Sequence, residues 1–390
     1  MRNCIDFLLS LQKVKYMINR QLQPQIKKLL GGNKAIIIMG ARQVGKSTLL
    51  KDLLGNSENT LWMNGDDLDI QELLKNMTSE RFKTILGNNK YLVIDEAQRV
   101  PDIGLKIKLV TDQIPGVQVI ATGSSSFQLA SKVNETLTGR KRKFTMYPLS
   151  FKEMVEHHGL LTELRLLPHR MIYGYYPETV TSPGNEKEVL MELSTSYLYK
   201  DILQLDGISK PEKLERLLQA LARQIGDQIS YREIGMLIDL DPKTVERYID
   251  ILEQNFIVFR LGSYARNLRN ELKNSRKIYF YDLGIRNSVI RDFRNIESRD
   301  DVGALWENFV VAERVKHIAY ERSFGKMWFW RTTQQKEIDI IEENDGVMTA
   351  IEIKWNPAKK NVKVPAKFAE AYPDAQFKVI TPENVEQYLL

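Results

Sequence analysis

The chain has 390 residues, of which 43% are hydrophobic and 27% are charged. This composition is typical of a globular protein with two or three domains, and it excludes a disordered, collagen-like or fibrous chain. Lysine and arginine (56) exceed aspartate and glutamate (50), which gives a net charge of +6. The single cysteine, Cys4, excludes an internal disulfide framework and a zinc site built from several cysteines, and it fits a reducing cytosol.

The N-terminal segment predicts neither a signal peptide nor a membrane span. Its apolar run at residues 5–11 is short, is interrupted by Asp6 and is not followed by small cleavage-site residues. Apolar runs long enough for a membrane helix are absent from the rest of the sequence, so we expect a cytoplasmic protein without membrane contact. Because Met17 begins a segment that reads equally well as a natural start, we expect residues 1–16 to be an extension.

Short apolar runs alternate with amphipathic stretches between residues 34 and 149. These runs are residues 35–39, 60–63, 91–94, 117–121 and 143–146. Apolar strands separated by helical segments are typical of a parallel sheet that is buried on both faces. The sequence therefore predicts an α/β domain with a parallel sheet.

A glycine-containing loop follows the first apolar run and precedes a predicted helix. It reads Gly40-Ala41-Arg42-Gln43-Val44-Gly45-Lys46-Ser47-Thr48 and matches G-x-x-x-x-G-K-[ST], the pattern of a phosphate-binding loop, or P-loop. Its glycines let backbone N–H groups surround the phosphates, and the following helix N-terminus adds partial positive charge. Lys46 would reach the β- and γ-phosphates and the Ser47 hydroxyl would bind Mg²⁺. The predicted ligands of this loop are ATP and Mg²⁺.

Two carboxylates, Asp95 and Glu96, end the apolar run at residues 91–94. Alone, such a pair is equally typical of a strand that enters a solvated loop. It lies about fifty residues after a P-loop, however, and this spacing favours a catalytic interpretation. Asp95 would hold Mg²⁺ through water, and Glu96 would polarise the attacking water.

Together these segments resemble the AAA-type (AAA+) P-loop ATPases. The combination of Gly-x-Arg-Gln-Val-Gly-Lys-Ser, Ile-Asp-Glu-Ala-Gln, Thr-Gly-Ser-Ser and Leu-Thr-Gly-Arg resembles a large prokaryotic group related to archaeal ATPases. The resemblance implies that Ser124 or Ser125 senses the γ-phosphate; a serine-rich turn that caps a helix at Phe127 explains these serines as well. It also matches Arg20 to the arginine that opens the pattern of this group.

The basic residues 140–142 have three interpretations. Arg140 is the best candidate for an arginine finger on the nucleotide of a neighbouring subunit, which implies a homo-oligomer. The same residues fit contacts with DNA phosphates or a solvated turn before the next strand.

Helical patterns occupy residues 151–225, including one expected helix over residues 186–205, and we interpret this region as a lid or linker. Ser230 with Glu233 forms a capping box that begins the next helix, and Asp241 with Pro242 begins another. Predicted strands follow near residues 256–259 and 277–281. This is the layout of a winged helix-turn-helix, whose second helix either binds a DNA groove or serves as a structural contact.

The region from Arg260 to Arg294 has nine basic and three acidic residues, so its net charge of +6 equals that of the whole chain. A local basic stripe is what phosphate contact requires, and we predict that double-stranded DNA binds here. The basic residues are Arg260, Arg266, Arg269, Lys273, Arg276, Lys277, Arg286, Arg291 and Arg294.

Acidic residues mark two predicted strands of the C-terminal region, at residues 337–341 and 350–354. Period-2 alternation lets Asp339 approach Glu352 and Lys354, a set that would bind a divalent metal and orient a water. The pattern resembles the PD-(D/E)xK nuclease superfamily, which implies that Glu307 is its helical acid. A solvated hairpin with alternating charges and an inactive relic of the nuclease fold are the alternatives.

We therefore predict an ATPase, converting ATP and water to ADP and phosphate, that is coupled to DNA binding or processing. The alternative is an ATP-switched protein-binding or signalling module with an inactive nuclease-like domain. The expected fold is α/β. Its segments are an extension (1–16), an AAA-type core (17–150), a helical lid (151–225), a winged-helix segment (226–300) and a nuclease-like α/β domain (301–390).

Overall fold

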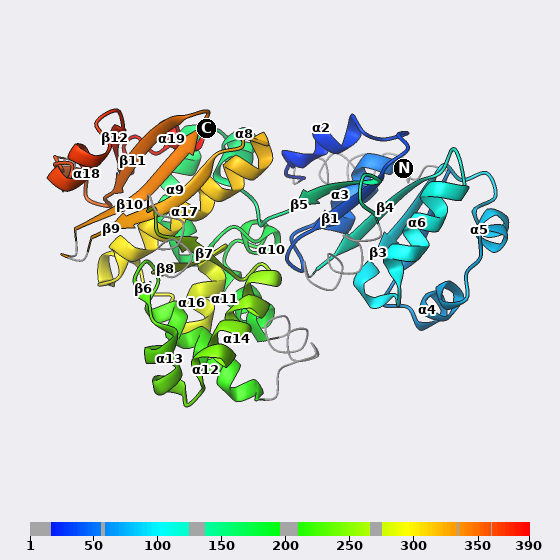
Figure 1. The fold of residues 1–390 in the computed structure, drawn as a ribbon, viewed down its shortest axis with the longest axis horizontal. Helices are drawn as coiled ribbons and strands as arrows, with labels where there is room; N and C mark the ends of the chain where they lie inside the picture. Colours follow the sequence, from blue (N-terminus) through cyan, green and yellow to red (C-terminus); the bar gives the residue numbers. More distant parts are fainter. Residues whose placement is uncertain are drawn as a thin grey trace, which may run out of the picture.

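The structure is a computed structural model that describes residues 17–55, 59–124, 137–195, 210–265, 275–332, 334, 336–359 and 361–390. Within these ranges the strands form three sheets, of five, four and three strands (Figure 1). The helices of the described ranges are all too short or too polar to cross a membrane.

The five-stranded sheet is parallel, as predicted, and its strands lie in the order β2-β3-β4-β1-β5. Every residue of β1 and β4 is buried, because these two strands lie inside the sheet and are covered on both faces. The strands are β1 (Ala35–Met39), β2 (Thr60–Asn64), β3 (Tyr91–Asp95), β4 (Gln118–Gly123) and β5 (Lys141–Thr145). The helices of this region are α2 (Leu22–Lys27), α3 (Lys46–Leu54), α4 (Leu68–Lys75), α5 (Ser79–Leu86) and α6 (Ile103–Gln113).

Helices follow the parallel sheet, as the sequence predicts. They are α8 (Phe151–His158), α9 (Leu160–Tyr173), α10 (Pro177–Thr181), α11 (Glu186–Leu193) and α12 (Pro211–Arg223). The helix expected over residues 186–205 is shorter: α11 ends at Leu193, and residues 196–209 lie outside the described ranges.

The segment between α9 and α10 is connected to a later helix, α16 (Leu283–Ile290), by buried polar contacts. The Asp282 carboxylate accepts hydrogen bonds from the backbone N–H of Tyr175 (2.6 Å) and of Ile285 (3.1 Å). Gly174 has a φ of +71°, and a Cβ there would collide with the Asp282 carboxylate, so this contact requires glycine. Burial raises the pKa of Asp282, while the backbone donor of Tyr175 lowers it.

The three-stranded antiparallel sheet has the order β6-β8-β7 and packs with two helices. Its elements are β6 (Gln228–Ile229), α13 (Tyr231–Ile238), α14 (Pro242–Gln254), β7 (Val258–Gly262) and β8 (Arg276–Phe280). Both predicted helix starts are confirmed: Ser230 Oγ accepts from the N–H of Glu233 (3.3 Å), and Asp241 Oδ1 accepts from that of Thr244 (3.0 Å).

The C-terminal sheet has the order β12-β11-β10-β9 and lies beside a long helix, α17 (Figure 1). The elements are α17 (Val302–Glu321), β9 (Lys326–Arg331), β10 (Glu337–Asn344), β11 (Val347–Ile353), α18 (Ala366–Ala371), β12 (Gln376–Ile380) and α19 (Glu386–Leu389). The predicted hairpin is present: β10 pairs antiparallel with β11 across Asp345 and Gly346, which have φ values of +50° and +81°. Two such residues are typical of a tight hairpin turn.

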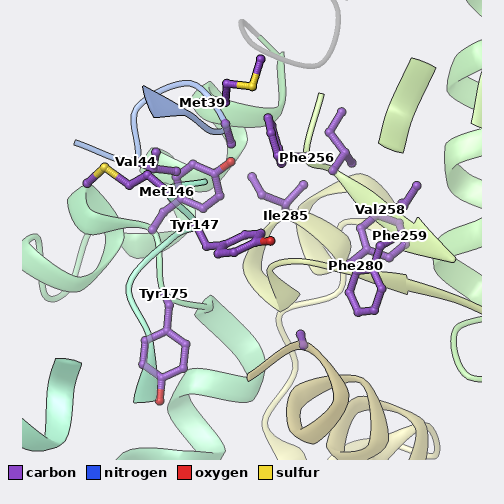
Figure 2. Packing of buried hydrophobic residues seen from close by; sticks show 14 of the residues in the cluster. Met39, Val44, Met146, Tyr147, Tyr175, Phe256, Val258, Phe259, Phe280 and Ile285 are labelled. Atoms are coloured by element: carbon purple, nitrogen blue, oxygen red, sulfur yellow. The ribbon is translucent and has the colours of Figure 1, made fainter. Parts of the chain in front are cut away.

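One hydrophobic core runs from the parallel sheet to the last helix. Tyr147 belongs to this core together with Met39, Met146 and Phe256 (Figure 2). The Tyr147 ring centroid lies 6.5 Å from that of Phe256 and 5.2 Å from that of Tyr281. The segment that leaves β5 therefore packs directly against the three-stranded sheet region.

Arg20 connects the P-loop with the rest of the molecule. It is only 8% exposed, and its guanidinium donates to the carbonyls of Val44 (2.6 Å) and Tyr147 (2.7 Å) and to the Glu153 carboxylate (3.0 Å). It also lies 3.5 Å from the Tyr320 hydroxyl of α17. Burial alone lowers the pKa of Arg20, but Glu153 and Tyr320 raise it above its usual value. Arg20 is therefore charged and bonded to four segments of the chain.

The Arg20→Met substitution should destabilise the protein strongly, because it leaves Glu153 buried without its charge partner. The loss of one member of a buried ion pair costs about 3–5 kcal/mol. The midpoint of urea unfolding, followed by circular dichroism, measures this effect. Lys75→Met is the control, since Lys75 pairs with Glu72 at 3.6 Å on the exposed side of α4. Equal midpoints for the two variants would contradict the role of Arg20.

Candidate functional site

The P-loop lies between the carboxyl end of β1 and the N-terminus of α3. Gly45 has a φ of +94°, which favours glycine, and a Cβ at Gly40 would collide with the backbone carbonyl of Met146. Lys46 is buried, and its ammonium donates to the carbonyls of Gly40 (2.9 Å) and Ala41 (2.8 Å). Burial lowers the pKa of Lys46, while Glu96 and Asp95 act in the opposite direction. The ammonium therefore lies inside the loop, as phosphate binding requires.

Ser47 and Asp95 meet on the other side of the loop. The Ser47 hydroxyl donates to Asp95 Oδ2 at 2.6 Å, and the Thr122 hydroxyl bonds the second oxygen of the same carboxylate. A hydroxyl and a carboxylate that lie next to each other are suitable ligands for Mg²⁺, which binds oxygen atoms directly or through water. Sequence reasoning missed Thr122; its place at the end of β4, next to β3, is the signal that points to it.

Glu96 begins the short turn after β3 and has a φ of +47°. Gln98 Nε2 donates to Glu96 Oε2 (2.5 Å) and to Ser124 Oγ (2.9 Å), so one amide connects the two candidate residues. The Glu96 N–H donates to the Thr122 hydroxyl at 3.2 Å. The structure thus brings Glu96 and Ser124 together, whereas Ser125 and Phe127 lie outside the described residues. Gln98 was missed, although it closes the Ile-Asp-Glu-Ala-Gln motif.

Arg140 lies near the first residue of β1, at the end of the strand opposite to the P-loop. Its carbonyl accepts from the N–H of Ala35, the first residue of β1, whereas the loop follows the last residue of that strand. Its guanidinium is half-exposed and pairs with Asp112 Oδ1 at 2.6 Å. Within one chain Arg140 is therefore remote from the nucleotide loop.

A cavity lies beside the P-loop, where the N-terminal segment, α3 and α10 come together. Its volume is about 190 Å³. Gly45 and Thr48 line it together with apolar side chains, which include Ile18, Leu49, Leu149 and Pro177. The lining is therefore largely apolar, although polar side chains such as Gln23 and Asp52 also contribute to it.

The C-terminal site residues also converge. Lys354 Nζ lies 2.6 Å from Glu352 Oε2 and 3.3 Å from Asp339 Oδ2, as strand alternation predicts. The backbone N–H of Ile353 donates to Asp339 Oδ2 at 2.7 Å. Glu307 of α17 lies close enough to Asp339 for the two charges to interact.

Two side chains of β8, Lys277 and Tyr279, complete this carboxylate cluster, and sequence reasoning missed both. Lys277 is 1% exposed, and its ammonium pairs with Glu307 (2.9 Å) and with Glu337. The Tyr279 hydroxyl donates to Glu307 at 2.6 Å. Burial, with a contribution from Asp339, raises the pKa of Glu307 to about 7.

Burial and then the charge of Asp339 also raise the pKa of Glu352. Over the described ranges, groups of three or more histidine, cysteine, aspartate or glutamate side chains suited to a metal ion are absent. In their place, the ammonium groups of Lys277 and Lys354 lie between the carboxylates. The metal site expected at Glu307, Asp339, Glu352 and Lys354 therefore stays a prediction.

The DNA contact expected between Arg260 and Arg294 stays a prediction, although internal ion pairs neutralise part of this basic stripe. Arg276 pairs with Glu246 at 3.1 Å and Arg294 with Asp292 at 2.8 Å. Further pairs are Arg260 with Asp250, Lys277 with Glu307, and Arg286 with Asp301. Arg266, Arg269 and Lys273 lie outside the described residues. A net charge counted along the sequence does not show which charges face solvent.

Three families match successive parts of the chain. Residues 32–155 match the family described as AAA domain. Residues 164–297 and 302–388 match two families that are each described as a domain of unknown function (DUF8612 and DUF4143).

Individual proteins are similar over most of the chain. An uncharacterized protein of Mycobacterium tuberculosis is 26% identical over 341 residues, which cover 86% of this chain and 73% of that protein. One of Haemophilus influenzae is 26% identical over 356 residues, 82% of this chain and 83% of that protein. Among solved structures, the Walker-type ATPase PABY2304 of Pyrococcus abyssi is 14% identical with a TM-score of 0.49, covering 70% of this chain and 96% of that one.

The match over residues 32–155 covers the parallel sheet and every element that positions the P-loop. The matched range also includes Lys46 and Ser47 at the start of α3, Asp95 at the end of β3, and Glu96 directly after it. This part of the chain is thus a P-loop ATPase domain of the AAA type.

Proposed function

We propose that the chain binds ATP at residues 40–48 and hydrolyses it with Glu96 as the base. The observation that carries this proposal is the convergence of Lys46, Ser47, Asp95 and Glu96 at one edge of the parallel sheet. Lys46 would hold the β- and γ-phosphates, and Ser47 with Asp95 would hold Mg²⁺. When bound, Mg²⁺ neutralises charge on the phosphate oxygens.

Glu96 accepts the proton of the attacking water on this proposal, and Gln98 orients its carboxylate. Gln98 contacts both Glu96 and Ser124, so it fixes the distance between the base and the residue that would sense the γ-phosphate. The apolar cavity beside Gly45 and Thr48 would receive the base of the nucleotide.

Arg140 would act on the nucleotide of a second copy of the chain, in a homo-oligomer. Support comes from its half-exposed side chain and from its position far from the P-loop of its own chain. A guanidinium supplied by a neighbour stabilises charge that develops during phosphoryl transfer.

The output of the ATPase, on this proposal, is DNA binding or processing by the C-terminal half. The order α13, α14, β7, β8 fits a winged helix within residues 226–300, after a helical lid at 151–225. The order α17, β9, β10, β11, α18, β12 with Asp339, Glu352 and Lys354 together fits a nuclease-like domain at residues 301–390.

A second candidate is an ATP-switched binding or signalling module whose nuclease-like domain is inactive. The observation that favours it is Lys277, a buried lysine outside the expected motif whose ammonium pairs with Glu307 and Glu337 of the carboxylate cluster. An ammonium that bridges two carboxylates competes with a divalent metal for the same oxygens.

The Lys46→Ala substitution should abolish ATP turnover and weaken ATP binding by roughly tenfold or more, because it removes a charged hydrogen bond to the phosphates. Phosphate release and calorimetric titration measure the two effects. Lys51→Ala is a matched control, since Lys51 is an exposed lysine of the same helix, α3. Unchanged turnover in Lys46→Ala would disprove the assignment of the loop.

The Glu96→Gln substitution should preserve ATP binding and slow hydrolysis by roughly 10²- to 10⁴-fold, the usual contribution of a general base. Single-turnover hydrolysis, measured beside the Kd for ATP, separates the two steps. Glu72→Gln on the exposed side of α4 serves as the control. Hydrolysis at the wild-type rate in Glu96→Gln would place the base elsewhere.

Incubation with supercoiled plasmid and Mg²⁺ or Mn²⁺ distinguishes the two candidates for the C-terminal half. If the nuclease-like domain is active, the wild-type chain cuts the plasmid and Asp339→Ala does not. Glu343→Ala is the control, because Glu343 is an exposed carboxylate on the same strand, β10. Absence of cutting by the wild type favours the inactive module, and identical cutting by wild type and Asp339→Ala assigns the activity to a contaminant.

A further inference from the structure

A groove lies between the edge strand of the ATPase sheet and the C-terminal end of α17. One wall is β5, which is the last strand of the order β2-β3-β4-β1-β5 and has an open hydrogen-bonding edge among the described strands. The other wall is formed by the end of α17 and the start of β9, around residues 315–327. Its volume is about 660 Å³. It is separate from both sites described above.

The charged side chains that line the groove are all positive. β5 contributes Lys141, Arg142 and Lys143, and the fourth is Arg322, the residue that caps the C-terminal end of α17. Glu321, the carboxylate that directly precedes Arg322 in the sequence, pairs with Lys152 at 2.6 Å and lines a different cavity.

Burial disfavours the charge of both lysines of β5, and Lys143 also disfavours the charge of Lys141. Partial burial and then the charge of Lys143 lower the pKa of Lys141, and burial lowers the pKa of Lys143. Such a group of like charges is stabilised when an anion binds, because the anion reduces their mutual repulsion. The groove therefore favours a ligand with several negative charges.

An aromatic side chain stands at the same place. Phe324 lines the groove and is 91% exposed, the most exposed of the large hydrophobic side chains in the described ranges. The guanidinium of Arg322 lies 4.6 Å from the centroid of the Phe144 ring, which holds this charge at the groove. Cations that follow a groove, with an exposed ring for stacking, are the combination that single-stranded nucleic acids use.

We propose that this groove binds a single strand of DNA or RNA, with its phosphates on the β5 cations and Arg322 and one base on Phe324. A duplex does not offer an unstacked base to Phe324, so the exposed ring favours the single strand. The inference rests on the proposed role in nucleic-acid binding and deepens it. It also moves the phosphate contacts away from residues 260–294, where internal ion pairs neutralise many of the basic side chains.

The position of the groove connects it to ATP hydrolysis. Along its whole length β5 pairs with β1, the strand that leads into the P-loop, and the Met146 N–H donates to the Met39 carbonyl at 2.6 Å. A nucleic acid bound along β5 is thus separated from the nucleotide loop by a single β-strand, β1. A single-stranded ligand should therefore change the rate of ATP hydrolysis.

The test is the anisotropy of a fluorescent thymidine 20-mer with the full chain at several salt concentrations. Arg142→Gln with Lys143→Gln should weaken binding roughly tenfold or more. It should also reduce the salt slope by roughly 1.4, because each phosphate contact on a single strand contributes about 0.7. Phe324→Ala should weaken binding roughly fivefold or more at unchanged salt slope, since it removes stacking and no charge.

Two double variants serve as matched controls, each with the same loss of charge. Lys243→Gln with Arg247→Gln alters the exposed side of α14, the rival nucleic-acid surface. Arg81→Gln with Lys90→Gln alters α5 and the residue before β3, a strand that β4 and β1 separate from β5. Both should retain nearly wild-type affinity, and the thermal midpoints of all variants verify that they fold.

Three results would overturn the inference. If the groove variant binds like the wild type while the α14 variant binds more weakly, the chain binds nucleic acid, but at α14 and not in the groove. If the Arg81 and Lys90 control weakens binding as much as the groove variant, the effect is net charge alone. If the wild-type chain binds neither the 20-mer nor a duplex, the proposed nucleic-acid function itself fails.

Discussion

A single buried cation, the guanidinium of Arg20, is the contact on which the arrangement of the molecule depends. A buried charge is tolerated only where it is paired and hydrogen-bonded, and Arg20 meets this condition with the Val44 and Tyr147 carbonyls and the Glu153 carboxylate. Glu153 also accepts from the Ser150 N–H as part of the α8 capping box. The P-loop, the segment after β5 and the start of α8 must therefore assemble together, which couples the nucleotide loop to the helices behind it.

The same principle holds the C-terminal half in place. On α17, Glu313 accepts from the Phe151 N–H (2.7 Å) and from the Lys316 ammonium (2.6 Å), so this helix is fixed to α8 by buried groups. At its other end, Glu307 bonds Lys277 of β8. Buried ion pairs contribute little net stability, but they disfavour other arrangements, because every alternative leaves a charge without its partner. A shift of the P-loop on ATP binding would thus reach α17 through groups that resist separation.

Much of the ATPase part was predictable from sequence, because its signals are local. The P-loop motif and the apolar runs of the parallel sheet are short patterns with a direct physical meaning, and the structure has both. Outside the ATPase part, the helix starts at Ser230 and Asp241 are local signals of the same kind. The strand alternation that placed Asp339 beside Lys354 is local in the same sense. The contact of Lys277 with Glu307 was missed because it joins distant residues: Lys277 is in β8 of the three-stranded sheet and Glu307 is in α17. Side-chain partners of this kind are set by tertiary packing, and charge counted along the chain does not reveal them.

Among the described strands, β5 lies at the edge of its sheet, and this position has a consequence for association between copies of the chain. Exposed edge strands tend to pair with a second sheet, and positive side chains on the edge oppose this pairing through repulsion. Three of the five residues of β5, Lys141, Arg142 and Lys143, carry positive charge. Edge-to-edge stacking of two ATPase sheets would bring two such triplets together. Bound polyanion or high salt would remove that protection, so the chain should be most prone to aggregate through β5 when its charges are screened.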